Sequence, residues 1–482
     1  MWISGSPGAG KSAVASTLVS SLTRRRRLAS SCFFKRGDAV LSEPTALWHT
    51  VAFDLCRFNT DVKDCIVDFL SKTEFRDGDI RLHFECMIEE PLTKNHDKLC
   101  PLPPVVVVDA LDECGTDESQ SAQRRILLDT ISHWSCLPKL CKLIITSRDE
   151  RLPASFHDEQ LCRRIILETG DSVGQETRED IWIFFKQSFH EIRPSLGMSS
   201  TWPGKSAMDR LTERAAGLFI WAKTAIAFME EKRGKPAGKL DLILAGDLGT
   251  RNDNVDSLYR QILDFYFSDV DDSMFDLFKA VIGAIIVVKI PFHRDDLKHF
   301  LGIQDEEDER QIGVILHSLS SVISADGTIR LRHFSFAEFL TDAKRCHDHR
   351  FSIDKNKLHC DLAFACLRLM KAGLKFNICG LETSYLRNHH VPGLSERITT
   401  LIPTRLQYSC RFWAAHLCEV TTDRNRCGAL LKEVKDFLYV RLLYWLEVMS
   451  LIKEVPASSV ALLTAAKWIK VSGFIVWVID GL

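Results

Sequence analysis

The stretch Gly5-Ser6-Pro7-Gly8-Ala9-Gly10-Lys11-Ser12 lies almost at the start of the 482-residue chain. Glycines at these spacings let the backbone curl around an anion, while the lysine reaches the outer phosphates and the serine suits Mg²⁺. Residues 2–4 before it form a short apolar strand pattern, and residues 13–22 after it favour a helix. Strand, glycine loop and helix therefore follow in the order of a phosphate-binding loop. A glycine-rich turn that only caps a helix is the alternative.

The composition argues for an intracellular protein without a preference for nucleic acid. Lys and Arg number 62 against 64 Asp and Glu, so the chain carries no overall basic field. The run Arg24-Arg25-Arg26-Arg27 follows the expected first helix, where cations suit the helix dipole better than they indicate a targeting signal. The 16 cysteines show no CxxC pairs, and no secretory signal precedes the loop. We expect reduced thiols, a cytoplasmic location and no transmembrane segment.

A second informative stretch is Pro104-Val105-Val106-Val107-Val108-Asp109-Ala110-Leu111-Asp112-Glu113. Four consecutive valines indicate a central parallel strand that is buried on both faces. Asp109 then lies at the carboxyl edge, where open α/β sheets bind ligands, and suits a carboxylate that supports Mg²⁺. Asp112 and Glu113 come one short turn later, where a carboxylate can orient or deprotonate an attacking water. The alternative is that these residues only form the polar end of a strand and have no catalytic role.

Further strands and helices alternate around these stretches. Residues 142–145 predict a strand that ends in Thr146-Ser147-Arg148, from which Arg148 either reaches a γ-phosphate or is a surface arginine. Other strands are expected at 29–35 and 164–167, and helices at 46–58, 64–70 and 80–88. This alternation predicts a multidomain α/β plus α protein that begins with a doubly wound parallel sheet covered by helices on both faces.

Together these motifs resemble the NACHT group of signal-transducing NTPases, especially the large fungal set of NOD-like receptor proteins. The resemblance rests on Gly5 to Ser12, on the valine-rich strand that ends in Asp109-Ala110-Leu111-Asp112-Glu113, and on Thr146-Ser147-Arg148. It extends to about residue 450 and implies a P-loop NTPase of the STAND class. Relatives commonly continue into WD-type or other repeats, so we expect a fragment that lacks them. A first strand at residue 2 also suggests that the start of the domain is missing.

Beyond residue 170 the pattern becomes helical. Apolar residues at helical spacing mark one helix over 181–189 and a second that is interrupted by Gly217. The resemblance implies that this part covers the base of the nucleotide. Gly217-Leu218-Phe219 occupies the place of a Gly-Leu-Pro element of many relatives, with Phe219 instead of the proline. A simple packed turn between helices is the alternative.

Residues 272–345 predict a winged helix. Helices are expected at 274–288, 292–301 and 312–319, followed by a hairpin around Ala325-Asp326-Gly327. Such folds often bind DNA, but Asp305-Glu306-Glu307-Asp308-Glu309 opens the third helix. Five carboxylates repel phosphates while they suit the helix dipole. We therefore expect no nucleic-acid binding.

The stretch His333-Phe334-Ser335-Phe336-Ala337-Glu338-Phe339-Leu340 resembles a His-x-Ser-Phe-x-Glu-Phe-Leu element of the same family. In related switch proteins a winged-helix histidine touches the β-phosphate of ADP, and the resemblance implies this role for His333. A structural histidine at a strand end is the alternative. From residue 357 onward the chain is helical and rich in Leu, Phe, Trp and Cys, with no repeat period of 20 to 50 residues.

The expected organisation is an NTPase domain at 1–168, a helical lid at 169–240, a winged helix at 241–345 and a helical region at 346–482. The leading hypothesis is a signalling switch that binds and slowly hydrolyses ATP or GTP with Mg²⁺ and holds ADP at rest. Its expected partners are other protein chains, including copies of itself. A hydrolysis-inactive scaffold and a small-molecule kinase are the alternatives, although the long helical remainder has no obvious use in a compact kinase.

The expected site draws on residues from four stretches. Glu113, Asp112 and Arg148 are the catalytic candidates, and Ser12 with Asp109 would hold Mg²⁺. The nucleotide-binding candidates are Gly5, Ser6, Pro7, Gly8, Ala9, Gly10, Lys11, Ser12, Ala13 and His333.

Overall fold

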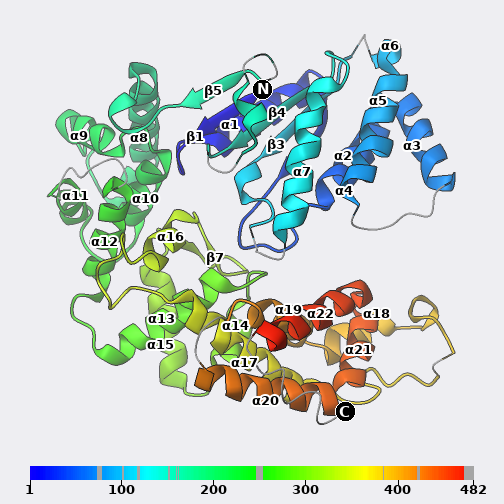
Figure 1. Cartoon of the computed structure of the whole chain (residues 1–482). Helices are drawn as coiled ribbons and strands as arrows, with labels where there is room; N and C mark the ends of the chain where they lie inside the picture. Colours follow the sequence, from blue (N-terminus) through cyan, green and yellow to red (C-terminus); the bar gives the residue numbers. More distant parts are fainter. Residues whose placement is uncertain are drawn as a thin grey trace. The chain divides into compact units, whose positions relative to one another are not determined.

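The computed structural model describes residues 1–72, 79–99, 102–116, 120–149, 152–158, 160, 162–245, 253–383, 385–420 and 424–471. The chain divides into two compact units (Figure 1). The first comprises Met1–Phe265 together with His333–Ser335, and the second comprises Tyr266–Arg332 and Phe336–Leu482.

The first unit is built on a parallel sheet with the strand order β2-β3-β4-β1-β5. All the strand pairs are parallel, which confirms the predicted parallel sheet and brings the carboxyl ends of the strands to one edge. Strand β1 is short, yet it lies between β4 and β5 and is buried at Trp2, Ile3 and Ser4. The strands are β1 (Trp2–Gly5), β2 (Leu28–Phe33), β3 (Val105–Asp109), β4 (Lys142–Ser147) and β5 (Arg164–Leu167).

Helices cover both faces of this sheet because the chain changes direction after its first crossover. From β1 it moves through α1 (Lys11–Arg24) outward to β2, and it then returns across the sheet to β3, β4 and β5. Right-handed crossovers in opposite directions place α1 on one face and the later helices on the other. Strand β3 is buried over its whole length, as its four valines predict.

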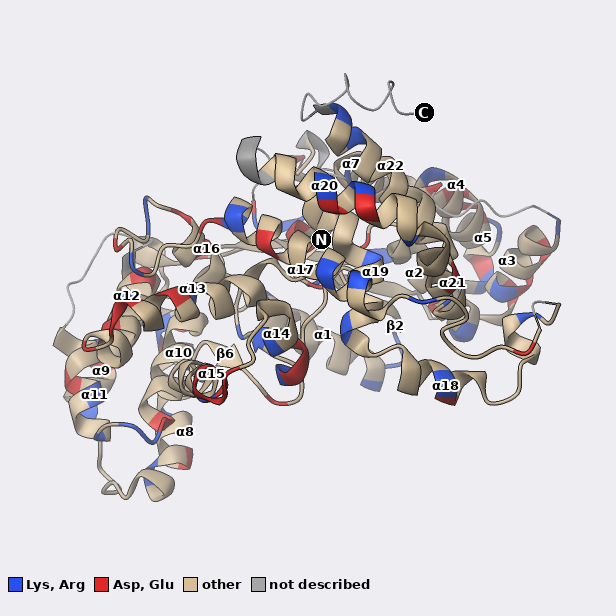
Figure 2. Cartoon of the chain, turned by 90° about the horizontal axis from the view of Figure 1, so that it is seen from below, with Lys and Arg blue, Asp and Glu red and all other residues tan. Residues whose placement is uncertain are grey.

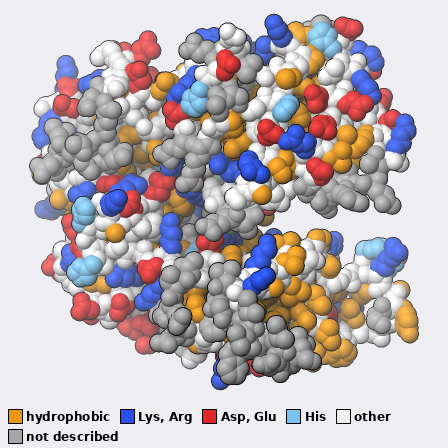
Figure 3. All heavy atoms as spheres, in the orientation of Figure 1, with side chains coloured by type: hydrophobic (Ala, Val, Ile, Leu, Met, Phe, Trp, Pro, Cys, Tyr) orange, Lys and Arg blue, Asp and Glu red, His pale blue; other side chains and the backbone are white. Residues whose placement is uncertain are grey.

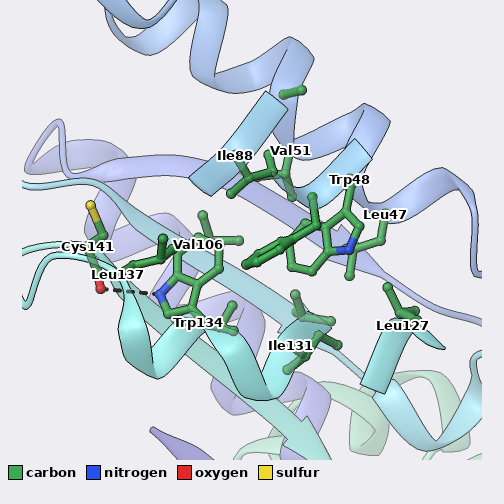
Figure 4. Close-up of a cluster of buried hydrophobic side chains, with 14 of the residues drawn as sticks. Leu47, Trp48, Val51, Ile88, Val106, Leu127, Ile131, Trp134, Leu137 and Cys141 are labelled. Atoms are coloured by element: carbon green, nitrogen blue, oxygen red, sulfur yellow. Dashed lines mark hydrogen bonds between the residues drawn. The ribbon is translucent and has the colours of Figure 1, made fainter. Parts of the chain in front are cut away.

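An aromatic and aliphatic core fills the face opposite α1 (Figure 4). Val106 of β3 points into it, and Trp48 and Trp134 lie stacked with ring centroids 6.1 Å apart. Each indole N–H keeps a hydrogen-bond partner, since Trp134 donates to the carbonyl of Cys141 at 3.3 Å and Trp48 donates to the hydroxyl of Thr130 at 2.9 Å. These pairs allow two large rings to be buried without leaving a polar group unsatisfied.

The other helices of the first unit agree with the predicted ones in position more than in extent. The helix predicted at 46–58 is α2, and that at 64–70 lies inside α3. The helix predicted at 80–88 continues as a π-helical turn, Glu85–Glu89. The helices that follow α1 are α2 (Ala46–Phe58), α3 (Thr60–Lys72), α4 (Ile80–Phe84), α5 (Glu90–Lys94), α6 (His96–Leu99) and α7 (Ser121–His133).

A helical part completes the first unit. The interruption predicted at Gly217 is confirmed: Ala216 and Gly217 adopt positive φ angles of 45° and 81°, which no α-helix accommodates, and they separate two helices. The helices are α8 (Gln175–Leu196), α9 (Lys205–Ala215), α10 (Phe219–Glu230), α11 (Pro236–Ala245) and α12 (Asp253–Phe267).

The second unit starts with three helices and a hairpin in the predicted order. These are α13 (Asp272–Val287), α14 (Arg294–Leu301), α15 (Glu306–Ser318) and the antiparallel pair β6 (Ile323–Ser324) and β7 (Arg330–Leu331). Carboxylates gather at the start of α15 (Figure 2), where the side chain of Asp305 caps the helix by accepting the amide of Glu307. The order of elements agrees with a winged helix, and that assignment stays a prediction.

The remainder of the second unit is helical, as predicted. Helices α17 and α19 pack closely together, and α22 packs on α19. The helices are α16 (Ser335–Thr341), α17 (Lys355–Gly373), α18 (Leu394–Leu401), α19 (Thr404–Leu417), α20 (Arg424–Val440), α21 (Leu442–Leu451) and α22 (Val455–Val471).

The surface shown in Figure 3 carries positive and negative side chains interspersed. No disulfide joins the cysteines in the described part of the chain. Within the same residues, no helix combines the length and the apolar character needed to cross a membrane. The arginine run follows the end of α1, and Arg24, Arg25 and Arg26 are exposed.

Candidate functional site

The glycine loop connects β1 to α1, as the sequence predicts. Gly8 and Gly10 adopt φ angles of +81° and +95°, a left-handed region that favours glycine. The amide of Ala9 donates to the carbonyl of Ser6 at 3.2 Å, which closes the loop upon itself. Helix α1 begins directly at Lys11, so its unpaired N–H groups and positive dipole end face the loop. This arrangement suits an anion.

The first turn of α10 lies against the loop. The amide of Ile220 donates to the carbonyl of Gly8 at 3.2 Å. A Cβ added at Gly8 would lie 2.0 Å from Cγ2 of Ile220, and one added at Gly10 would lie 3.4 Å from the ring of Phe219. The two glycines therefore provide close approach as well as conformational freedom. Sequence reasoning placed Phe219 in a lid element but gave no signal for the contact of Ile220.

Lys11 joins the loop to the charged residues at the carboxyl edge of the sheet. Its ammonium donates to the carbonyls of Gly5 at 2.9 Å and Ser6 at 3.0 Å. Burial lowers the pKa of Lys11, while the nearby carboxylates of Asp112, Asp109 and Glu113 raise it and Arg148 lowers it. Because the carboxyl ends of β1, β3 and β4 lie at one edge of the sheet, Lys11 comes within electrostatic reach of the four predicted charged residues, Asp109, Asp112, Glu113 and Arg148.

Asp109 is held in one orientation at the end of β3. It is 3% exposed, and the hydroxyl of Thr146 on the neighbouring strand β4 donates to its Oδ1. The same hydroxyl accepts the amide of Ala110 at 2.9 Å, and Ala110 adopts a positive φ of 56°. Thr146 therefore fixes both the carboxylate and the turn that follows it. Its position beside Arg148 in the sequence gave no sign of this role.

Replacement of Thr146 by valine should destabilise the first unit by about 1–3 kcal/mol, because the buried amide of Ala110 loses its acceptor. The free energy of unfolding from denaturant titration measures this. Thr17→Val is the matched control, since Thr17 is exposed and its hydroxyl donates to the carbonyl of Ala13 within α1. Equal effects of the two substitutions would contradict the assigned role of Thr146.

Asp112, Glu113 and Arg148 have defined partners. Asp112 accepts the backbone amide of Arg148 at 3.0 Å, and its carboxylate lies 3.1 Å from the Arg148 guanidinium, with both side chains less than a fifth exposed. Glu113 accepts the backbone amide of Arg36 at 2.8 Å. Burial raises the pKa of Glu113, with the charge of Asp112 adding to the effect and the Arg36 amide, Arg148 and the Arg36 charge opposing it. No feature of the sequence pointed to Arg36.

The remaining predicted residues differ in their surroundings. Ser12 and Ala13 are exposed on the first turn of α1, Ala9 is buried, and the hydroxyl of Ser6 accepts from Thr169 at 3.0 Å. Pro7 is half-buried. These residues surround the loop backbone rather than add charge to it.

His333 lies in a hydrogen-bonded group with Ser335 and Tyr259. Its Nδ1 is 2.7 Å from the hydroxyl of Ser335, which also lies 2.7 Å from the hydroxyl of Tyr259. The guanidinium of Arg36 stacks on the ring of Phe334, 4.7 Å from its centroid. The predicted contact of His333 with a β-phosphate stays a prediction.

Comparisons with known proteins support the family expected from these motifs. The family model "Nephrocystin 3, N-terminal" matches residues 1–148. Vegetative incompatibility protein HET-E-1 of Podospora anserina is 23% identical over 489 residues, which cover 95% of this chain and 33% of that protein. These similarities support the NACHT-type STAND family that the motifs predict. The chain spans about a third of the length of this curated relative.

Solved structures give weaker likenesses. A STAND protein with a tetratricopeptide repeat sensor from Pyrococcus horikoshii is 12% identical, with a TM-score of 0.39 over 97% of this chain and 62% of that one. The ORC2 protein of Aeropyrum pernix is 11% identical, with a TM-score of 0.29 over 68% of this chain and 82% of that one. Scores this low establish no shared fold. The match to the family model and the likeness to HET-E-1 support, at the family level, a nucleotide-binding signalling NTPase.

Proposed function

We propose that this NACHT-type chain is a nucleotide-dependent signalling switch that binds a nucleoside triphosphate with Mg²⁺ and hydrolyses it slowly. The observation that carries the proposal is the approach of Lys11, from the glycine loop, to Asp109, Asp112, Glu113 and Arg148 at the carboxyl edge of the sheet. A phosphate chain needs such a mixture of cationic and acidic groups beside a helix N-terminus. Its partners would be other protein chains, including further copies of itself.

The residues fit a nucleotide and a magnesium ion. The loop offers backbone amides around two left-handed glycines, and Lys11 supplies a positive charge at the helix end. The described residues contain no cluster of three His, Cys, Asp or Glu side chains that would hold a metal alone. Mg²⁺ prefers few protein ligands and several oxygens from phosphate and water, which suits Ser12 and Asp109. When bound, it would neutralise charge that develops on the phosphates.

Each charged side chain of the site would have a separate role in binding or hydrolysis. Lys11 would bind the outer phosphate oxygens, and Arg148 would bind the terminal phosphate as a rigid cationic fork. Glu113 would orient the attacking water and accept its proton, which its raised pKa favours. In the resting state ADP would remain bound, with His333 at its β-phosphate.

A hydrolysis-inactive scaffold is the second candidate, and one observation favours it. Asp112 pairs with Arg148, and Glu113 accepts the Arg36 amide, so both acidic residues beyond Asp109 already hold protein groups. A carboxylate used to hold the backbone activates water poorly. Slow turnover and absent turnover both agree with this geometry.

Nucleotide content after purification tests the proposal directly. The full chain should retain ADP or GDP, and it should bind added ATP or GTP more tightly with Mg²⁺ than with EDTA. Chromatography of the released nucleotide and titration calorimetry measure these two properties. A chain that contains no nucleotide and binds neither ATP nor GTP would refute the proposal.

Replacement of Glu113 by glutamine separates the switch from the scaffold. We expect single-turnover hydrolysis to fall by about 10²–10⁴-fold, the usual contribution of a general base. Binding should change little, because the amide oxygen of glutamine still accepts the Arg36 amide. Glu43→Gln is the control, since Glu43 is a partly buried carboxylate that bonds to Thr45 and Gln120 instead. Tight binding with no turnover in either form would favour the scaffold.

A further inference from the structure

The segment Ser147-Arg148-Asp149 at the end of β4 is held at each of its three residues. The indole N–H of Trp2 donates to the hydroxyl of Ser147 at 2.8 Å. Asp112 holds Arg148 through both its backbone amide and its guanidinium. Asp149 pairs with Arg164, whose Nη2 lies 2.6 Å from its carboxylate, and His157 lies 3.8 Å from the same carboxylate. The backbone of Arg148 is therefore fixed from both sides.

Besides its ion pair with Asp149, Arg164 makes two further contacts near the glycine loop. It lies at the start of the edge strand β5, and its Nε donates to the hydroxyl of Ser4 at 3.0 Å. Its guanidinium also stacks on the indole ring of Trp2, 4.4 Å from the centroid. Ser4 directly precedes the glycine loop, and it is 1% exposed. One guanidinium thus contacts the strand that starts the loop and the residue that follows Arg148.

We infer that Arg164, with Trp2, is a positioning residue that aligns Arg148 with the phosphate loop, so that Arg148 distinguishes a triphosphate from a diphosphate. Two hydrogen bonds from one rigid planar guanidinium suit this task, because they fix an angle as well as a distance. A surface ion pair alone would be worth little, but Trp2 is fully buried and confines the guanidinium. The inference rests on the proposed function, and in particular on the role of Arg148.

The test is the ratio of affinities for triphosphate and diphosphate in the full chain. Titration with AMP-PNP and ADP, or with GMP-PNP and GDP if guanine is preferred, measures it. Arg164→Met should lower the preference for the triphosphate about tenfold, the lower end of what loss of an orienting partner costs. Diphosphate affinity should stay unchanged. Arg164→Lys should restore the preference in part, and Arg163→Met, at the exposed neighbouring residue, should have no effect.

A merely structural role is distinguished by a double-variant cycle. If Arg164 acts through Arg148, then Arg148→Ala should lower the ratio and Arg164→Met should lower it no further in that background. The inference would be overturned if the effects of Arg148→Ala and Arg164→Met on the affinity ratio multiplied, or if Arg164→Met alone left that ratio unchanged. Either result would leave the proposed function intact. If Arg164→Met does not fold, Asp149→Asn at the exposed end of the pair must lower the ratio instead. An unchanged ratio in Arg148→Ala would refute the role of Arg148 itself.

Discussion

Lys11→Ala should weaken nucleotide binding by about 100-fold. The ammonium is the only cation that the loop itself provides, and hydrogen bonds from a charged donor contribute roughly 1.5–3 kcal/mol each. The substitution should leave the fold intact, because alanine is a good helix former at the first position of α1. Titration calorimetry with the preferred nucleotide measures the loss, and circular dichroism checks the fold.

Two further variants make this result specific. Lys11→Arg keeps the charge but carries a wider head group, so it should bind more weakly than the original chain and more tightly than Lys11→Ala. Lys63→Ala removes an exposed lysine from α3 of the same unit and should bind normally. If Lys11→Ala left the nucleotide affinity unchanged, the glycine loop would not be part of the nucleotide site.

The sheet was predictable because its signals are local. Four consecutive valines are typical of a strand that is buried on both faces, and β3 is such a strand. The strand predicted at 164–167 has the same bounds as β5. The carboxyl-edge rule then placed Asp109, Asp112, Glu113 and Arg148 near Lys11 without any three-dimensional information. Parallel strands bring their carboxyl ends to one edge whatever residues lie between them.

The supporting contacts were not predictable, since they depend on register and packing. Thr146 meets Asp109 only because β3 and β4 pair with one particular offset. Arg164 of β5 meets Asp149, which follows β4, across the one intervening strand β1. Arg36 reaches Glu113 through its backbone amide, which no side-chain pattern encodes. The interruption at Gly217 was predicted, but the left-handed φ of 45° at Ala216 was not, because alanine normally favours helix.

Gly8→Ala should destabilise the first unit by about 2–5 kcal/mol. Two costs combine here. Alanine in the left-handed region costs roughly 1–2 kcal/mol, and a methyl group placed 2.0 Å from Cγ2 of Ile220 forces α10 or the loop to move at a further cost of about 1–3 kcal/mol. The free energy of unfolding measures the sum. The displaced loop should also bind nucleotide more weakly.

Gly37 separates these two costs. It has a similar φ of +77°, but an added Cβ there would meet nothing within 4 Å, so Gly37→Ala should show the backbone strain alone. Ile220→Ala in the Gly8→Ala background removes the nearest atom, Cγ2, but leaves Cβ at 2.7 Å, so it should recover only part of the remaining cost. If Gly8→Ala lowered the free energy of unfolding no more than Gly37→Ala does, α10 would not lie against the loop. A larger loss that Ile220→Ala partly relieves would instead confirm that α10 lies in direct contact with the backbone of the glycine loop.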